Sequence, residues 1–180
     1  MSELPGGRRV ALALAAVAVS SVLLHRQVAD ALVVRGDEFL YRARAKAALC
    51  YYRRALWLDR SSSPALDRLL FVAMTIRDRA ALRDGIARAK SYLLANPGDD
   101  TVRLDRAMAY KLLGESARAW KDFAVAGYRL RDPRALTLGG YEAKAAGLDV
   151  QALRLLRSAL VLAPEFPPAL HALTRVRTLQ

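Results

Sequence analysis

The chain has 180 residues and carries 29 lysines and arginines against 17 aspartates and glutamates, a net charge of +12. This length holds one domain of ordinary size, and the basic excess favours acidic partners such as nucleic acid, anionic lipid or an acidic protein surface. Cys50 is the only cysteine, which excludes an intrachain disulfide and a thiolate cluster for a metal. We expect its side chain to be buried in helix packing.

An apolar run from residue 10 to residue 24 lies near the start of the sequence, between Arg9 and Arg26. We predict a flexible basic N-terminus over 1–9 and a transmembrane signal anchor over 10–27. As a helix, the apolar run spans about 22 Å, which is short of the ~30 Å hydrocarbon core. The flanking arginines can snorkel to the interfaces and so cover the difference.

Two other interpretations of this run remain open. A basic start, an apolar middle and the small residues Ala29 and Ala31 also describe a cleavable signal peptide. A buried helix of a soluble protein can have the same composition. We favour the uncleaved anchor, because a cut after Ala31 would remove the start of the helix that follows.

The orientation of the chain in the membrane is predicted from the basic residues on either side of the anchor. Their numbers are nearly balanced, so the short N-terminus with Arg8 and Arg9 decides the orientation and is expected to stay in the cytoplasm. The small size and the arginine bias of the chain suggest a bacterial source. We therefore predict a single-pass protein of the bacterial inner membrane with its remaining residues in the periplasm; a cytoplasm-facing domain is the alternative.

One pattern recurs along the rest of the chain. A small or apolar residue is followed by a bulky one four positions later and by an alanine three positions after that. The copies begin at Ala48, Leu82, Ala119 and Ala152, which are 34, 37 and 33 residues apart. A period in the mid-thirties with two helices per unit predicts a helical solenoid.

Breaks at proline, glycine, serine and aspartate divide this region into helices. The first unit pairs a helix that begins near Val28 with one over 43–59. The second unit has helices over 64–76 and 79–94. The third covers 100–131 with a turn at 114–115, the fourth covers 132–163 with a turn at 147–149, and a final capping helix covers 168–179. On that last helix we expect Leu170, Leu173 and Val176 to cover the exposed end of the core.

These units resemble the tetratricopeptide repeat (TPR) family over about residues 29–180. In the first unit, Leu32, Gly36 and Phe39 occupy the family's bulky, small and aromatic positions, and the fourth unit matches at three further positions: Leu136, Gly140 and Ala143. The resemblance implies an all-α, TPR-like solenoid of about four helix pairs plus a capping helix, extending over 28–180. It also implies a protein that binds partners rather than an enzyme.

The chain offers little for catalysis. Its two histidines, His25 and His171, and Cys50 have neither metal-ligand spacing nor a nucleophile–base context. The neighbouring Asp99 and Asp100 are typical of a helix cap. The pair at 139–140 lacks a phosphate-binding pattern and is expected to allow close helix packing. We predict no enzymatic activity, no cofactor and no metal.

The resemblance to the TPR family also implies a concave groove lined by the first helix of each unit. The groove residues carried over are Phe71, Met74, Leu104, Met108, Lys111, Tyr141 and Lys144. No position offers the lysine and asparagine with which some TPR proteins hold a C-terminal carboxylate. We expect the groove to bind a peptide or amphipathic helix with acidic character. Alternatively, some of these side chains pack between the repeats.

The leading functional prediction is a membrane-anchored TPR adaptor that binds a protein partner during assembly or maturation of a bacterial envelope enzyme or complex. The alternative is a basic helical-repeat module that binds anionic lipid or nucleic acid. Nucleic acid is disfavoured because the arginines are dispersed, whereas nucleic-acid surfaces combine clustered basic residues with aromatic platforms.

Overall fold

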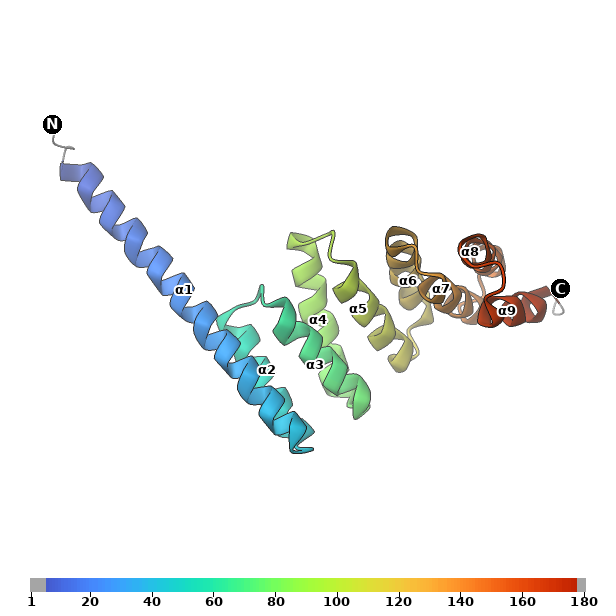
Figure 1. Ribbon diagram of the computed structural model, residues 1–180, viewed down its shortest axis with the longest axis horizontal. Helices are drawn as coiled ribbons and strands as arrows, with labels where there is room; N and C mark the ends of the chain where they lie inside the picture. Colours follow the sequence, from blue (N-terminus) through green and yellow to red (C-terminus); the bar gives the residue numbers. More distant parts are fainter. Residues whose placement is uncertain (1–5, 178–180) are drawn as a thin grey trace. The chain divides into compact units, whose positions relative to one another are not determined.

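The computed structural model describes residues 6–177. In this part every regular element is an α-helix (Figure 1). The helices are α1 Gly6–Tyr41, α2 Ala45–Leu58, α3 Ser63–Thr75, α4 Arg79–Ala95, α5 Asp100–Leu113, α6 Ser116–Leu130, α7 Pro133–Ala145, α8 Asp149–Leu162 and α9 Pro167–Arg177. The chain divides into two compact units, Met1–Ala65 and Leu66–Gln180, which we describe separately. Of the predicted flexible start over 1–9, Met1 to Pro5 lie outside the described residues.

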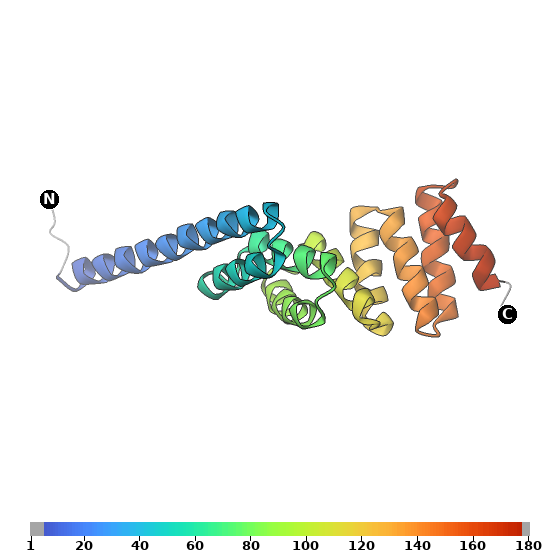
Figure 2. The same ribbon diagram turned by 90° about the horizontal axis from the view of Figure 1, so that it is seen from below.

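The first unit is built on one uninterrupted helix of 36 residues, α1. Its C-terminal part pairs with α2, which turns back along it (Figures 1 and 2). Gly36 allows this close approach, because a Cβ added there would lie 2.4 Å from the ring of the fully buried Tyr52. The Tyr52 hydroxyl donates a hydrogen bond of 2.7 Å to Asp37, and Phe39 stacks on Tyr51 at 5.0 Å.

The N-terminal part of α1 carries apolar side chains that no protein contact covers. Among the described side chains, the segment Val17–Tyr41 is long and apolar enough to cross a membrane, and only 11% of its most apolar window is buried. A signal sequence passes the same test of length and composition. The low burial disfavours the interpretation of this run as the core helix of a soluble protein.

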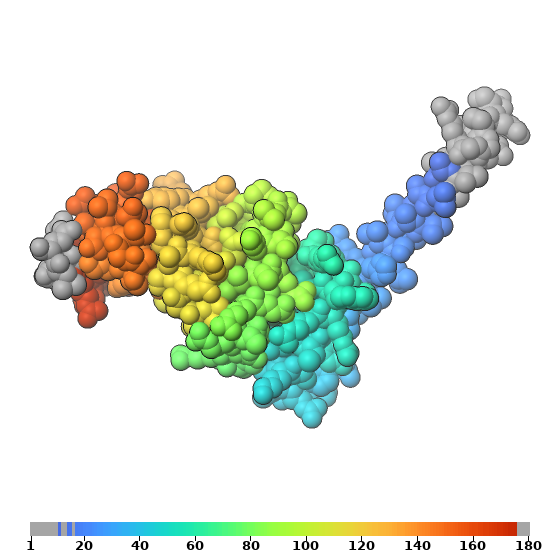
Figure 3. All heavy atoms as spheres, turned by 180° about the vertical axis from the view of Figure 1, so that it is seen from behind, coloured from blue at the N-terminus to red at the C-terminus, as the bar shows by residue number. Residues whose placement is uncertain are grey.

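In the second unit α4 packs against α3 at Gly85 and Leu70. Likewise α6 packs against α5 and α8 against α7, and α9 contacts both α7 and α8. Figure 3 shows sequence-adjacent segments side by side from α4 onward, in green to orange. Small residues again permit close helix approach: a Cβ on Gly85 would lie 2.5 Å from Leu70, and a Cβ on Gly140 would lie 2.8 Å from Leu156. The close-packing role predicted for 139–140 is therefore confirmed.

Local signals explain the ends of these helices. Gly114 (φ 80°) and Gly147 (φ 76°) adopt the left-handed conformation that turns the chain within the third and fourth predicted units. The side chains of Asp78, Asp99 and Asp132 cap α4, α5 and α7 by accepting hydrogen bonds from backbone N–H groups. From α2 to α8 the helices accordingly begin and end within about two residues of the predicted bounds. The exception is α1, which begins at Gly6, inside the predicted flexible start, and runs without a break through the predicted anchor into the first unit.

Two predictions of burial were wrong. Cys50 is exposed, because it follows the buried Leu49 by one residue, which turns it about 100° around α2 and away from α1. On α9, Leu170 is also exposed, while Ala169 and Ala172 are buried. The covering face of α9 therefore consists of Ala169, Ala172 and the half-buried Leu173, which packs against Leu156 and Ala172. The prediction is confirmed for Leu173 and wrong for Leu170, and the side chain of Val176 lies outside the described ones.

Candidate peptide-binding groove

Large apolar side chains are exposed at equivalent positions of three first helices. Phe71 of α3 is 52% exposed, and Met108 of α5 and Tyr141 of α7 are each 37% exposed. The residues beside them, including Val72 and Ala107, are buried in the helix pairs. Aligned apolar side chains that remain in contact with water mark a surface suited to a partner.

Contacts between the helices show that these three positions belong to neighbouring elements. The carboxyl groups of Asp105 on α5 and Asp67 on α3 are close enough to interact, so these two helices meet. Leu138 of α7 packs against a buried cluster that contains Ala107 of α5 and Phe123 of α6. The first helices α3, α5 and α7 therefore follow one another within the second unit. We call the surface formed by Phe71, Met108 and Tyr141 the groove.

The other apolar residues predicted for the groove are less accessible. Met74 and Leu104 are half-buried, and Leu104 packs against the cluster that includes Tyr110 and Phe123. For Leu104, this contact supports the alternative that some predicted groove residues pack between repeats. Tyr141 is positioned by α9, because its hydroxyl donates a 3.2 Å hydrogen bond to the carbonyl oxygen of Pro168.

The two predicted lysines differ in their electrostatic surroundings. The Lys144 ammonium lies 2.8 Å from a carboxylate oxygen of Asp149, so an internal ion pair already compensates its charge. Lys111 is half-buried and has no ion-pair partner among the side chains that the structure describes. It lies three residues after Met108, which places it about one helical turn farther along the same face of α5.

Two carboxylates lie on the side of the groove residues that is away from Lys111. Asp67 and Asp105 precede Phe71 and Met108 by about one turn. Burial, and then the charge and hydrogen bond of Asp67, raise the pKa of Asp105 to about 7. Near neutral pH Asp105 therefore keeps its proton in much of the population. The contact of Asp105 with Asp67 could not be predicted from the sequence, because 38 residues separate the two.

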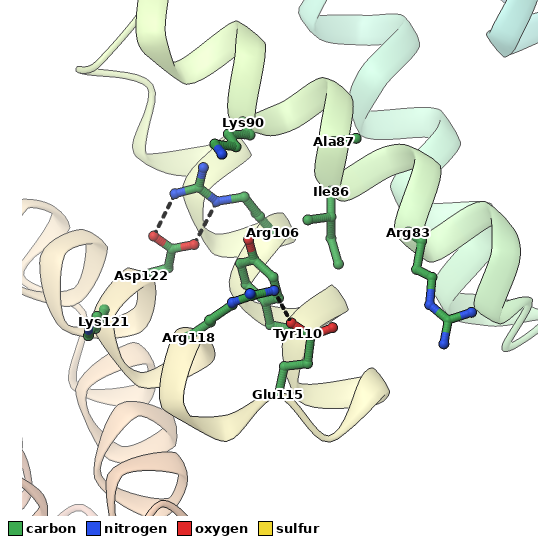
Figure 4. Close-up of a pocket in the computed structure, with 10 residues that line it drawn as sticks. All are labelled: Arg83, Ile86, Ala87, Lys90, Arg106, Tyr110, Glu115, Arg118, Lys121 and Asp122. Atoms are coloured by element: carbon green, nitrogen blue, oxygen red, sulfur yellow. Dashed lines mark hydrogen bonds and ion pairs between the residues drawn. The ribbon is translucent and has the colours of Figure 1, made fainter.

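A cleft lies between α4, α5 and α6, outside the groove. Its volume is about 580 Å³ (Figure 4). Its lining residues are Arg83, Ile86, Ala87, Lys90, Arg106, Tyr110, Glu115, Arg118, Lys121 and Asp122. We call this feature the basic cleft. Nothing in the sequence distinguished its charged residues from other charged positions of the repeats.

One ion pair holds the centre of the basic cleft. The Arg106 guanidinium donates two hydrogen bonds of 2.7 Å to the Asp122 carboxylate, and both side chains are at least 86% buried. Burial alone would lower the pKa of Arg106, but the hydrogen bonds and charge of Asp122 outweigh it and raise the pKa. This two-point geometry fixes α5 against α6.

No metal site emerges from the described part of the chain. There, His, Cys, Asp and Glu side chains form no group of three or more suited to hold a metal ion. His25 lies on α1 and His171 on α9, and the exposed Cys50 lies on α2.

The repeated helix pairs, their glycine contacts and their turns define a TPR-like helical-repeat fold. Comparison with solved structures shows the same class of fold. A crystal structure of MamA matches with a TM-score of 0.68 at 15% sequence identity, over 88% of this chain and 81% of that protein. A tetratricopeptide repeat protein from Parabacteroides merdae matches with a TM-score of 0.66 at 17% identity, over 85% of this chain and 61% of that one.

PilF from Pseudomonas aeruginosa is also similar, with a TM-score of 0.62 at 18% identity, over 86% of this chain and 70% of PilF. No protein-family model matches the sequence, and no curated protein matches it. At identities this low, the structural similarity shows a common fold only. The binding partner has to be inferred from the site.

Proposed function

We propose that this protein is a membrane-anchored TPR adaptor that binds a protein partner in the groove. The observation that carries this proposal is the repetition of exposed apolar side chains at equivalent positions: Phe71, Met108 and Tyr141. A helical-repeat fold presents such positions as an extended surface without needing a catalytic centre. The protein acts by binding and is not an enzyme.

The bound element is an amphipathic helix or an extended peptide with an acidic residue. Its apolar side chains lie against Phe71 and Met108, where the flexible thioether of Met108 adapts to different shapes. Its acidic residue faces Lys111, the groove lysine whose charge no described side chain compensates. Lys144 contributes less, because Asp149 already pairs with it.

Site-specific photo-crosslinking in native membranes tests this groove. A photoreactive amino acid at position 71 or 108 is expected to trap one protein partner, whereas the same group at Val161 of α8, which is 80% exposed, traps none. A charged substitution at the neighbouring groove position, Met108→Glu, should abolish the adduct formed at position 71. Equal trapping from position 161 would contradict the proposal.

The anchor is the apolar N-terminal part of α1, predicted over 10–27, and the repeats lie in the periplasm of a bacterial cell. The exposed apolar surface of α1 supports the anchor, and Arg8 and Arg9 support the orientation. In that compartment the adaptor serves the assembly or maturation of an envelope enzyme or complex.

A compartment-sensitive reporter fused after Gln180 tests this orientation. Reporter activity outside the cytoplasm, in a chain of full length on the same blot, is the expected result. A shortened exported chain would instead show a cleaved signal peptide. Activity in the cytoplasm would reverse the orientation and leave the groove to a cytoplasmic partner.

A further inference from the structure

We propose that the basic cleft is a second binding site, which takes an acidic segment of a partner protein. The site is separate from the groove, although both use α5. Met108 is two residues from both Arg106 and Tyr110, which turns its side chain about 200° around α5 from either one. The groove and the basic cleft therefore lie on opposite faces of that helix.

The basic cleft has an excess of positive charge. Its lining contains five basic and two acidic residues, which leaves a net charge of +3. Arg106 is paired with Asp122, and Arg118 with Glu115. The remaining cations are Arg83, Lys90 and Lys121, and none of them has an ion-pair partner among the described side chains.

The paired residues give the basic cleft a defined shape. Arg118 lies 2.6 Å from Glu115, and its guanidinium sits over the Tyr110 ring at 5.8 Å (Figure 4). With the Arg106–Asp122 pair, this arrangement limits the movement of the two central arginines. Ile86 adds apolar surface, against which the methylene groups of an acidic side chain can pack.

The spacing of the uncompensated cations fits an extended acidic segment. Arg83 and Lys90 are both exposed on α4 and are seven residues apart, two helical turns or about 10.5 Å. In the extended polyproline II conformation, three residues cover about 9 Å and bring the side chain back to the same face. Aspartates at positions i and i+3 of such a segment therefore face both cations at once.

Other anionic partners fit the basic cleft less well. Single-stranded nucleic acid requires exposed aromatic platforms, but Tyr110 is only 9% exposed and Arg118 covers its ring. A flat bilayer surface cannot fill a hollow between three helices, whereas a peptide can.

The test is a fluorescence anisotropy titration of the full chain in detergent, at low salt. The probe is a labelled peptide with aspartate at every third position. Arg83→Glu combined with Lys90→Glu is expected to raise the Kd at least tenfold. The matched control, Arg154→Glu combined with Arg157→Glu, changes the net charge equally at two exposed positions of α8, and is expected to shift the Kd less than twofold.

Three outcomes would overturn the proposal. Equal weakening by the two double variants would show that net charge, not the basic cleft, holds the peptide. An oligonucleotide or an anionic vesicle that binds tighter than the peptide, and loses this affinity in the Arg83 and Lys90 variant, would assign the site to that ligand. Absence of peptide binding to the unmodified chain would also exclude it. Circular dichroism and groove crosslinking from position 71 verify that each variant is folded.

Discussion

At the scale of single residues, close helix approach depends on glycines that have no room for a methyl group. Gly127 of α6 is one of them, because a Cβ there would lie 2.9 Å from the Leu136 side chain and 3.0 Å from its backbone nitrogen. A backbone atom cannot move aside as a side-chain end can. Alanine at this position must therefore push α6 away from α7.

We expect Gly127→Ala to lower the free energy of unfolding by about 1–3 kcal/mol, despite the better helix propensity of alanine. Gly98→Ala is the matched control: no atom lies within 4 Å of its added Cβ, and its effect should be within about 0.5 kcal/mol of zero. Urea unfolding followed by circular dichroism compares the two variants. Equal stability of both would contradict the packing argument.

The raised pKa of Asp105 predicts that stability depends on pH. The folded state retains a proton up to about pH 7, whereas the unfolded carboxyl loses it near pH 3.8. Folding therefore binds a proton between these values, and the free energy of unfolding falls as the pH rises from about 4 to about 7, then levels off.

Asp105→Asn removes this titration and keeps a donor for the Asp67 carboxylate. We expect it to raise the free energy of unfolding by about 1–2 kcal/mol at pH 8, a value reduced for partial solvent exposure, and by little at pH 5. Unfolding in urea at the two pH values measures the difference. The same gain at both would show that Asp105 is not the titrating group.

At the scale of helices, the Arg106–Asp122 pair joins α5 to α6 inside one helix pair. Removal of the carboxylate leaves a mostly buried guanidinium without a counterion. We expect Asp122→Ala to lower the free energy of unfolding by about 2–4 kcal/mol. A double-mutant cycle with Arg106→Ala should give a coupling energy of about 1–3 kcal/mol, whereas a coupling near zero would show that the pair contributes nothing beyond its separate side chains.

Helix bounds could be predicted well, but the buried face of a short helix could not. Asp99 and Gly114 act within a few residues of their own position, so their effects are visible in the sequence. The face of α9 depends instead on which side chains meet α7 and α8. The prediction was therefore wrong at Leu170, which is exposed, whereas Ala169, about 100° away around the helix axis, is buried.

At the scale of the whole molecule, the exposed apolar part of α1 predicts stable membrane insertion. Val17→Arg places a charge inside the predicted anchor, at a cost of about 2.5–3.5 kcal/mol. Val34→Arg is the matched control, since Val34 is similarly exposed on α1 but lies beyond residue 27. We expect alkaline carbonate to extract much more of the Val17 variant than of the control. Identical extraction would place the anchor elsewhere or show a different mode of attachment.

The candidate groove was only partly predictable. The TPR resemblance supplied the helices and positions, among them Phe71, Met108 and Tyr141, which the structure exposes. The resemblance could not show that Asp149 compensates Lys144, or that Leu104 contributes to packing. Both depend on side chains contributed by other helices.

The sequence by itself determined an all-α repeat, its period, its turns and an apolar N-terminal helix. Those features follow from local rules: helix capping, glycine conformation, and the spacing of small and bulky residues. Only the tertiary structure decided which charges are compensated. Asp67 meets Asp105, and Arg106 meets Asp122, across separations of 38 and 16 residues. For this reason only the basic cleft had to be found in the folded chain, because the charges that stay uncompensated at a surface depend on neighbours that folding brings together.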